Sequence, residues 1–156
     1  MKTLSIIRHG KATQEPMPDI KRYLTPKGIN RTIKRTKDLL QIDVKPDLII
    51  SSPAIRAFET AEILAKELKY QKQIGINPVF YFHALPDVMS QIKQIPDTFE
   101  NVIIVGHNPV WTDLADYFLP GPLVHLRTSG LAVVNFDTFK WSGIHPNKVK
   151  NYHLFN

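Results

Sequence analysis

Hydrophobic residues along this chain occur in two patterns, short uninterrupted apolar runs and longer stretches in which apolar positions recur at helical spacing. The apolar runs predict buried strands at residues 4–7, 47–51, 102–106 and 131–136. Helical spacing follows the first three runs and recurs between 85 and 95, where one face carries Leu85, Val88, Ile92 and Ile95. Strands that alternate with helices in this way predict an α/β fold, a three-layer α/β/α sandwich with a mostly parallel central sheet.

The first predicted helix begins after a polar loop at residues 11–23. Thr25 can accept a hydrogen bond as the N-cap residue, and Pro26 suits the first helical position. Apolar residues at helical spacing predict the face of this helix that enters the core, formed by Ile29, Ile33 and Leu40. Gly28 in the first turn is costly for a helix, which indicates that another backbone segment approaches closely there.

Two further helix starts and two further extended segments are predicted. A capping residue followed by a proline marks the helix starts, at Ser52-Pro53 and at Asn108-Pro109. Residues 76–82 predict an extended segment interrupted by a proline, and the alternation over 149–155 predicts an edge strand. Because no repeat or long linker divides the chain, we expect residues 1–156 to form a single domain without a large cap insertion.

Composition narrows the class of protein further. The chain has 156 residues, of which 43% are hydrophobic and 22% charged, as is typical of a globular enzyme or binding domain. The absence of cysteine excludes disulfides, thiolate metal sites and thiol catalysis. No signal-peptide pattern and no apolar run of membrane-spanning length occur, so we expect a cytoplasmic monomer that does not associate with membranes.

The net charge of +6 would attract acidic partners, although a solvated basic surface gives the same balance. Aromatic residues do not interleave with the basic ones in a stacking pattern, so a nucleic-acid partner is not expected. Both interpretations, solvated surface and docking face, remain open for the basic residues of the first predicted helix, Lys27, Arg31, Lys34, Arg35 and Lys37.

Candidate chemistry lies where the predicted strands end. Arg8-His9-Gly10 follows the first run, Arg56 follows the second, and His107 follows the glycine that closes the run at 102–106. Because the carboxyl ends of parallel strands share one edge of a sheet, these side chains can converge there. Two arginines and two histidines without a carboxylate suit a phosphoryl group rather than a metal ion, so we expect no metal and no cofactor.

A histidine in such a pocket can act as a nucleophile toward phosphorus. The pKa of a free imidazole is about 6.5, so its nitrogen lone pair is largely available near neutral pH. Nearby arginines disfavour the protonated form and keep that lone pair available. The segment at residues 8–10 therefore predicts phosphoryl transfer in which arginines neutralise charge and a histidine attacks.

Three motifs resemble those of the histidine phosphatase (phosphoglycerate mutase-like) superfamily, in its order and spacing. They are Arg8-His9-Gly10, residues 51–56 (Ser-Ser-Pro-Ala-Ile-Arg) with Glu59-Thr60-Ala61, and Gly106-His107-Asn108-Pro109. The small size and the segment from Asp19 to Gly28 look most like the SixA-type phosphohistidine phosphatases. The resemblance covers essentially the whole chain and implies the phosphoglycerate mutase-like fold.

The resemblance also implies roles for individual residues. His9 would be the nucleophile that forms a phosphohistidine, while Arg8, Arg56 and His107 would bind the phosphoryl oxygens. Arg22 matches a further basic residue near the pocket of the SixA branch. The implied activity is a metal-independent phosphatase acting on phosphohistidine in proteins; alternatives are a small-molecule phosphomonoesterase and a noncatalytic phosphate-binding module.

One feature departs from the family pattern. Larger members carry a general acid, often a glutamate, in the region that corresponds to residues 80–87, where this chain has none at the expected place. His83 or Asp87 could substitute, although each is more readily interpreted as a loop residue. A missing acid suits a leaving group that departs easily, and imidazole leaves far more readily than an alkoxide.

Overall fold

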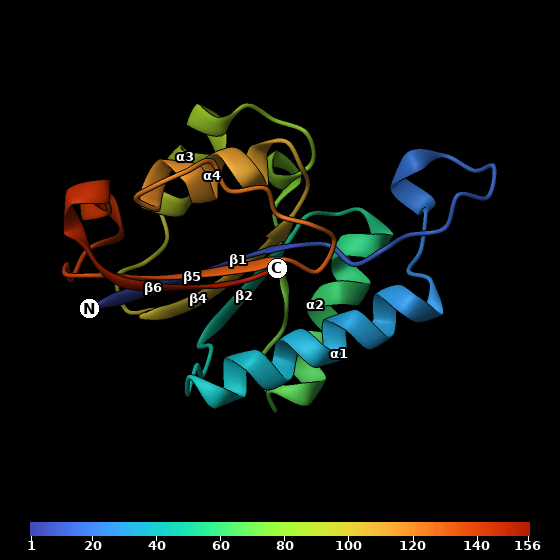
Figure 1. Ribbon diagram of the computed structural model, residues 1–156, viewed down its shortest axis with the longest axis horizontal. Helices are drawn as coiled ribbons and strands as arrows, with labels where there is room; N and C mark the ends of the chain where they lie inside the picture. Colours follow the sequence, from blue (N-terminus) through green and yellow to red (C-terminus); the bar gives the residue numbers. More distant parts are fainter.

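A six-stranded mixed sheet forms the middle layer of the molecule in the computed structural model, which describes residues 1–156 (Figure 1). The strand order is β3-β2-β4-β1-β5-β6. The first four of these strands pair in parallel, whereas β5 is antiparallel to both of its neighbours, β1 and the edge strand β6. The strands are β1 (Lys2–Arg8), β2 (Leu48–Ser51), β3 (Gly75–Ile76), β4 (Asn101–Gly106), β5 (Leu131–Phe136) and β6 (Val149–Phe155).

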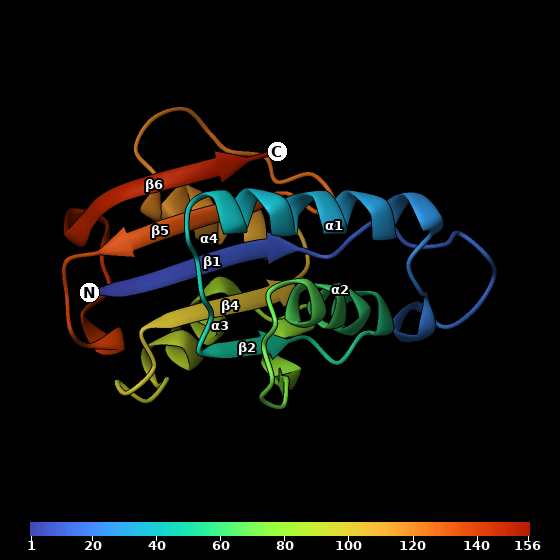
Figure 2. The ribbon, with the colours of Figure 1, turned by 90° about the horizontal axis from the view of Figure 1, so that it is seen from below.

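Helices cover both faces of the sheet, which confirms the predicted α/β/α sandwich. Figures 1 and 2 show α1 (Pro26–Gln41) and α2 (Ile55–Glu67) on one face, with α3 (Leu85–Lys93) and α4 (Val110–Phe118) on the other. Side chains along β1 point alternately to the two faces of the sheet. Leu4 and Ile6 pack in the core on the α3–α4 side, and Ile7 packs in the core on the α1–α2 side. None of these helices combines the length and apolar character needed to cross a membrane.

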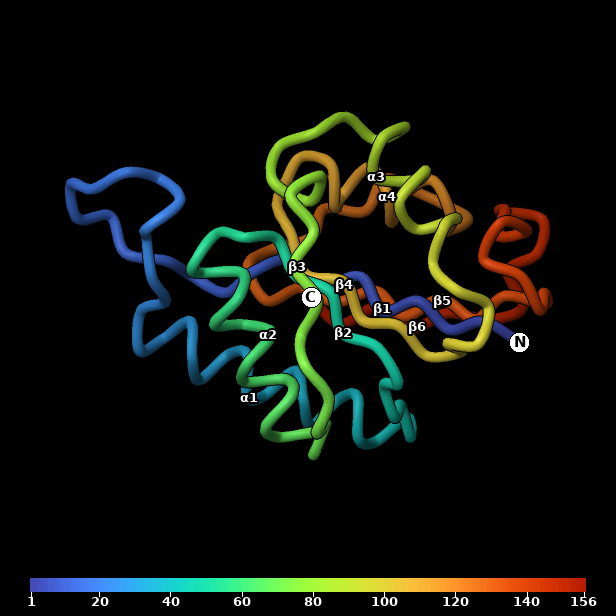
Figure 3. Tube along the Cα trace, turned by 180° about the vertical axis from the view of Figure 1, so that it is seen from behind, coloured from blue at the N-terminus to red at the C-terminus, as the bar shows by residue number.

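The carboxyl ends of β1, β2 and β4 lie at the same edge of the sheet. Arg8 is in register with Gly106, and Ser51 with Val105. Beyond the strands, the amide of His9 donates to the Gly106 carbonyl over 3.0 Å, which holds the chain leaving β1 against the chain leaving β4. Figure 3 shows the loop that joins β1 to α1 at this end of the sheet, away from the N-terminus.

The sequence prediction for residues 76–82 was wrong in most of that segment. Only Gly75–Ile76 pairs with β2, and a 3-10 turn follows at Pro78–Phe80. The Asn77 side chain caps this turn by accepting from the Val79 amide at 3.0 Å, so the chain leaves the sheet as soon as the strand ends. The predicted edge strand at 149–155 is confirmed as β6, paired with β5.

The predicted start of α1 is confirmed, but its predicted core face is wrong. The Thr25 hydroxyl accepts from the Gly28 amide at 3.0 Å, as an N-cap does. Ile29 and Leu40 are 37% and 55% exposed. The buried positions are mostly small or polar, because the helix packs against the loop leaving β1 rather than against a purely apolar surface; they are Gly28, Thr32, Thr36 and Leu39.

The two other predicted helix starts lie too early in the sequence. The α2 helix begins at Ile55, with Ala54 as the N-cap residue, and α4 begins at Val110. The Ser52 hydroxyl accepts from the Ala54 amide at 3.2 Å, and Asn108 Oδ1 accepts from the Thr112 amide at 3.1 Å. Ser52 and Asn108 thus lie before the helices, where Ser52 bonds to the amide of the N-cap residue of α2 and Asn108 bonds to an amide in the first turn of α4.

Glycine is required where the loop after β1 crosses the first turn of α1. A Cβ on Gly28 would lie 2.8 Å from the Lys11 amide nitrogen, and one on Gly10 would lie 3.1 Å from the Gly28 carbonyl oxygen. Gly10 was expected to supply a turn that other residues would strain to make. However, its φ is not positive, so close packing is what excludes a side chain there.

We predict that Gly28→Ala destabilises the protein by about 1–3 kcal/mol, because the new methyl group would overlap the Lys11 backbone. Helix propensity alone predicts the opposite sign, a gain of up to about 1 kcal/mol. Urea unfolding monitored by circular dichroism measures the difference. Gly75→Ala is the control, because a Cβ there meets no atom closer than 3.7 Å; equal stability of the two variants would contradict the close approach.

Candidate active site

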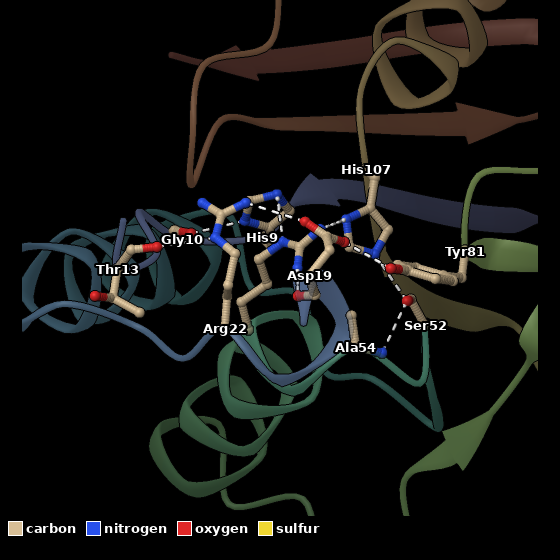
Figure 4. Close-up of polar contacts among 10 residues, drawn as sticks. His9, Gly10, Thr13, Asp19, Arg22, Ser52, Ala54, Tyr81 and His107 are labelled. Carbon is tan, nitrogen blue, oxygen red and sulfur yellow. Dashed lines mark hydrogen bonds and ion pairs between the residues drawn. The ribbon is translucent and has the colours of Figure 1, made fainter. Parts of the chain in front are cut away.

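Side chains from three strand ends meet around a pocket of about 250 Å³. Arg8 and His9 come from the end of β1, Arg56 from the first turn of α2, and His107 from the turn after β4. The two imidazole rings lie 5.0 Å apart between centroids. Figure 4 shows His9 and His107 facing the same space, with Arg22 and Asp19 beside them. The sequence-predicted arginines and histidines are therefore brought together by the fold.

The hydrogen bonds of His9 define its tautomer. Its Nδ1 lies 2.7 Å from the Gly10 carbonyl oxygen, which can only accept, so Nδ1 carries the proton. Nε2 then holds the lone pair and accepts from Arg56 Nε at 3.3 Å. His9 thus has a neutral ring, and the Gly10 carbonyl and Arg56 together orient its unprotonated nitrogen, Nε2.

His107 carries the opposite tautomer. Its Nδ1 accepts from Arg56 Nη2 at 3.3 Å, and its Nε2 therefore donates to the Ser52 hydroxyl at 2.8 Å. The ring packs against Phe82, with centroids 4.9 Å apart, and edge-on against Tyr81 at 5.4 Å. These aromatic rings restrict the access of water to one side of the imidazole.

Both imidazoles are held neutral. Burial lowers the pKa of His9 to about 3, and the charges of Arg56 and Arg8 add to this effect, although the hydrogen bond to Gly10 opposes it. Burial likewise lowers the pKa of His107 to about 3, together with the neighbouring His9 and Arg56. An incoming phosphoryl group would act in the opposite direction, because negative charge favours the protonated ring.

Arg56 is the central cation of the pocket and is only 2% exposed. Besides the two histidines, it binds Asp19 twice: Nη1 donates to the backbone carbonyl at 2.8 Å and Nη2 to the carboxylate at 3.0 Å. That carboxylate also accepts from the Tyr81 hydroxyl at 2.6 Å and from Arg22 Nη1 at 3.1 Å. Partial burial raises the pKa of Asp19, but these three donors outweigh it and bring the pKa to about 2.

Arg8 has donor capacity that the protein itself does not use. Its Nη1 donates to the Leu126 carbonyl at 3.1 Å, whereas its Nε is buried without a partner. Burial, and then the charge of Arg56, lowers the pKa of Arg8. A buried N–H without an acceptor is costly, and an oxyanion in the pocket would supply one.

The remaining sequence candidates divide into two groups. Arg22 lines the pocket, where its Nε donates to the Thr13 carbonyl at 2.8 Å. His83 and Asp87 are exposed and do not line it, so neither is placed to act as a general acid. The only carboxylate that lines the pocket is that of Asp19. No group of three or more His, Asp or Glu side chains is arranged to hold a metal ion.

No individual role in the site was predicted for Asp19, Tyr81 or Phe82, and Ser52 was predicted only as a helix cap and a member of the motif at residues 51–56. Asp19 begins the segment that resembles the SixA branch, but it lies in a polar loop, so its position in the site could not be found from periodicity. Phe82 has a φ of +56°, which is unusual for a non-glycine residue and directs the chain so that the ring faces His107.

Comparison with known protein families and sequences identifies relatives that match different lengths of this chain. Residues 4–78 match the histidine phosphatase superfamily (branch 1). An uncharacterised protein of Picosynechococcus is 31% identical over 136 residues, covering 82% of this chain and 81% of that protein. The mitochondrial serine/threonine-protein phosphatase Pgam5 of Drosophila ananassae is 31% identical over 81 residues, or 52% of this chain. That match covers 28% of Pgam5, so this chain corresponds to only part of it.

Solved structures share the whole fold. The protein histidine phosphatase SixA in complex with tungstate has a TM-score of 0.80 at 21% identity, covering 98% of this chain and 94% of that one. A protein from Nakamurella multipartitia, provisionally assigned as a SixA phosphohistidine phosphatase, has a TM-score of 0.81 at 19% identity, with 99% and 94% covered. The predicted phosphoglycerate mutase-like fold is confirmed, and this chain belongs to the histidine phosphatase superfamily.

Proposed function

We propose that this chain is a phosphatase in which His9 is the nucleophile, a covalent phosphohistidine is the intermediate, and phosphohistidine on a protein is the substrate. The observation that carries the proposal is the state of His9 in the pocket. Its Nδ1 proton is committed to the Gly10 carbonyl, so Nε2 keeps its lone pair among the cations that would hold a phosphoryl group.

The reaction would proceed in two displacements. In the first, the Nε2 lone pair of His9 forms a bond to phosphorus, and the bond from phosphorus to the leaving nitrogen breaks; its electron pair goes to the leaving imidazole, which departs neutral because its other ring nitrogen carries a proton. In the second, a water oxygen attacks phosphorus, the electron pair of the phosphorus–Nε2 bond returns to His9, and the water protons remain on the phosphate or pass to solvent. The products are the free histidine side chain of the substrate and inorganic phosphate.

The surrounding side chains would stabilise the charge on the phosphoryl oxygens. Arg8 offers its unpartnered Nε, and Arg56 supplies a planar guanidinium between the two imidazoles. His107 would gain a proton as the phosphoryl charge approaches and then donate from Nδ1. Arg22, which lines the pocket, would be the fourth side chain to donate hydrogen bonds to the phosphoryl group.

Two observations support a protein-borne phosphohistidine as the substrate. The positions that could have held a general acid, His83 and Asp87, are outside the pocket, which suits a leaving group that departs without strong acid assistance. In addition, only residues 68–74 join α2 to β3, which supports a pocket without a large cap insertion. We therefore propose that residues 1–156 act as one catalytic domain open to a protein substrate.

The substrate assignment is tested by comparing initial rates on a phosphohistidine-bearing protein with rates on phosphoserine peptides and small phosphate esters. The proposal requires kcat/KM to be highest on phosphohistidine. A strong preference for one small ester would instead indicate a small-molecule phosphomonoesterase. Tight binding of inorganic phosphate without turnover of any substrate would indicate a noncatalytic phosphate-binding module.

We predict that His9→Ala lowers turnover of an aryl phosphate by about 10⁴-fold or more, because the group proposed to form the covalent intermediate is removed. Binding of inorganic phosphate should persist in part, since the arginines remain. Rapid quenching of the unaltered protein in alkali, where phosphohistidine is stable, should trap label on His9. His83→Ala is the control, since that histidine is exposed outside the pocket. Normal turnover by His9→Ala would exclude the mechanism.

We predict that Arg56→Lys lowers kcat/KM by about 10²-fold. A single ammonium cannot reproduce the planar set of donors that bonds to His9, His107 and Asp19 at the same time. Steady-state kinetics on the aryl phosphate measure the effect. Arg31→Lys, on an exposed position of α1, provides a matched control; similar activity of both variants would place Arg56 outside the reaction.

The neutral state of both imidazoles predicts a pH dependence of stability. The pKa of His9 and of His107 is about 3 in the folded protein and about 6.5 in the unfolded chain, so between these values the unfolded chain binds more protons. The free energy of unfolding should therefore fall as pH falls from about 6.5 towards 3. Each histidine contributes a slope of up to about 1.4 kcal/mol per pH unit.

This slope is measured by urea unfolding at a series of pH values. His107→Asn should reduce it by up to about 1.4 kcal/mol per pH unit, whatever its effect on absolute stability. His153→Asn, on the edge strand β6, removes an exposed histidine and should leave the slope unchanged. An unaltered slope in His107→Asn would mean that this imidazole is not held neutral by the fold.

A further inference from the structure

The carboxylate of Asp19 lies where an anionic substrate would need to bind. It accepts from Arg56 Nη2 at 3.0 Å, from Arg22 Nη1 at 3.1 Å and from the Tyr81 hydroxyl at 2.6 Å. These contacts resemble those that a phosphoryl oxygen would make, because a carboxylate and a phosphate use the same donors. Figure 4 shows Asp19 between Arg22 and His107, and its partly exposed side chain lines the pocket.

Asp19 and the two histidines engage four of the five N–H groups of Arg56. Its Nε faces His9, its Nη1 bonds to the Asp19 carbonyl, and its Nη2 is shared between the Asp19 carboxylate and His107. A phosphoryl group that is to bind Nη2 must therefore take the place of the carboxylate. Arg56 is 2% exposed although the Asp19 side chain is 45% exposed, so a second anion held on Nη2 beside the carboxylate would be repelled by it.

The loop that carries Asp19 is attached to the rest of the protein in a way that permits this exchange. Its base is fixed, since the Thr13 amide donates to the Tyr23 carbonyl at 2.8 Å. Its other hydrogen bonds stay within the loop, such as those between Tyr23 and Glu15 and between Arg22 and Thr13. From residues 14–22, the hydrogen bonds to the body of the protein run through Asp19 alone.

Resting on the proposed function, we propose that Asp19 is a specificity-determining residue, an internal anion that holds Arg56 until a phosphoryl group displaces it. Only an anion that accepts hydrogen bonds from more donors than a carboxylate does can displace Asp19 from Arg56. A phosphoryl dianion does so, because it has three oxygens and more negative charge to offer Arg8, Arg56 and His107. Carboxylates and other weak monoanions are rejected, and the loop is released when the substrate binds.

The alternative role for Asp19 is to orient Arg56 for the substrate, and the two roles predict opposite signs. If Asp19 competes, the apparent affinity for inorganic phosphate is reduced by the fraction of molecules whose site is free, and removing the carboxylate restores it. If Asp19 only orients the guanidinium, removing the carboxylate weakens phosphate binding. A measurement of affinity, without turnover, separates them.

The experiment is titration of the full chain with inorganic phosphate, followed by isothermal calorimetry and by competitive inhibition of aryl phosphate hydrolysis. Asp19→Asn and Asp19→Ala should bind phosphate at least about tenfold more tightly than the unaltered protein. Tyr81→Phe, which removes one donor to the carboxylate, should tighten binding by a smaller factor of about two to five. Asp87→Asn is the matched control, since it removes one negative charge outside the pocket and should leave the affinity unchanged.

A second measurement uses the unaltered protein, so it does not depend on the folding of any variant. Saturating phosphate should increase hydrogen exchange of the amides in residues 14–22, because the loop loses its attachment when Asp19 leaves Arg56. In Asp19→Ala the same amides should exchange rapidly without phosphate and change little when it is added.

Equal or weaker phosphate binding by both Asp19 variants, or protection of residues 14–22 by phosphate, would overturn the inference. The proposed function would survive that result, because it depends on His9 and the arginines rather than on displacement of Asp19. Conversely, tighter phosphate binding together with normal turnover by His9→Ala would support the exchange at Arg56 while removing the proposed mechanism.

Discussion

The buried guanidinium of Arg56 is the constraint around which the pocket is built. A cation that is 2% exposed is tolerated only where its donors meet acceptors, because an unpaired buried charge costs several kcal/mol. Here the acceptors are two imidazole nitrogens, a carbonyl and a carboxylate. An imidazole nitrogen can accept from an arginine only when it is unprotonated, so this one cation favours the neutral state of both histidines. Burial of the rings is the larger cause of their neutral state, and the packing of Arg56 adds to it, so that a nucleophilic lone pair is available.

The sheet fixes the positions of these groups before any side chain is considered. Parallel pairing of β1 and β4 places Arg8 opposite Gly106, and the residue that follows each strand is a histidine. The imidazole of His9 is then fixed by its own neighbour Gly10, whose amide donates to the Thr60 hydroxyl at 3.0 Å. Since Thr60 lies one turn after Arg56 in α2, the same helix positions the cation and the turn that carries the nucleophile.

The parts of this structure that could be predicted from sequence are those with a strong local pattern. Buried β-branched runs, a Thr-Pro helix start and the strand-end histidines each depend on residues close together in the chain, and the fold follows them. The buried face of α1 could not be predicted in this way, because Thr32 bonds to Ser129 in the loop before β5 and no apolar period marks such a contact. Asp19 escaped prediction for a related reason, since its partners at 56 and 81 are distant in sequence.

The charge of the pocket is partly balanced by the protein itself when no phosphoryl group is bound. Its lining includes four cationic side chains and a single carboxylate, so mutual repulsion would open it if the positive charge were left uncompensated. Asp19 reduces that repulsion from a surface loop, while the sheet edge and α2 remain in place. Because the compensating group sits on an exposed loop and the cations sit on the core, the anion can be exchanged at the cost of loop contacts alone. The arrangement separates the cations Arg8 and Arg56, which are positioned by the sheet edge and α2, from the carboxylate that compensates their charge, which lies on a loop.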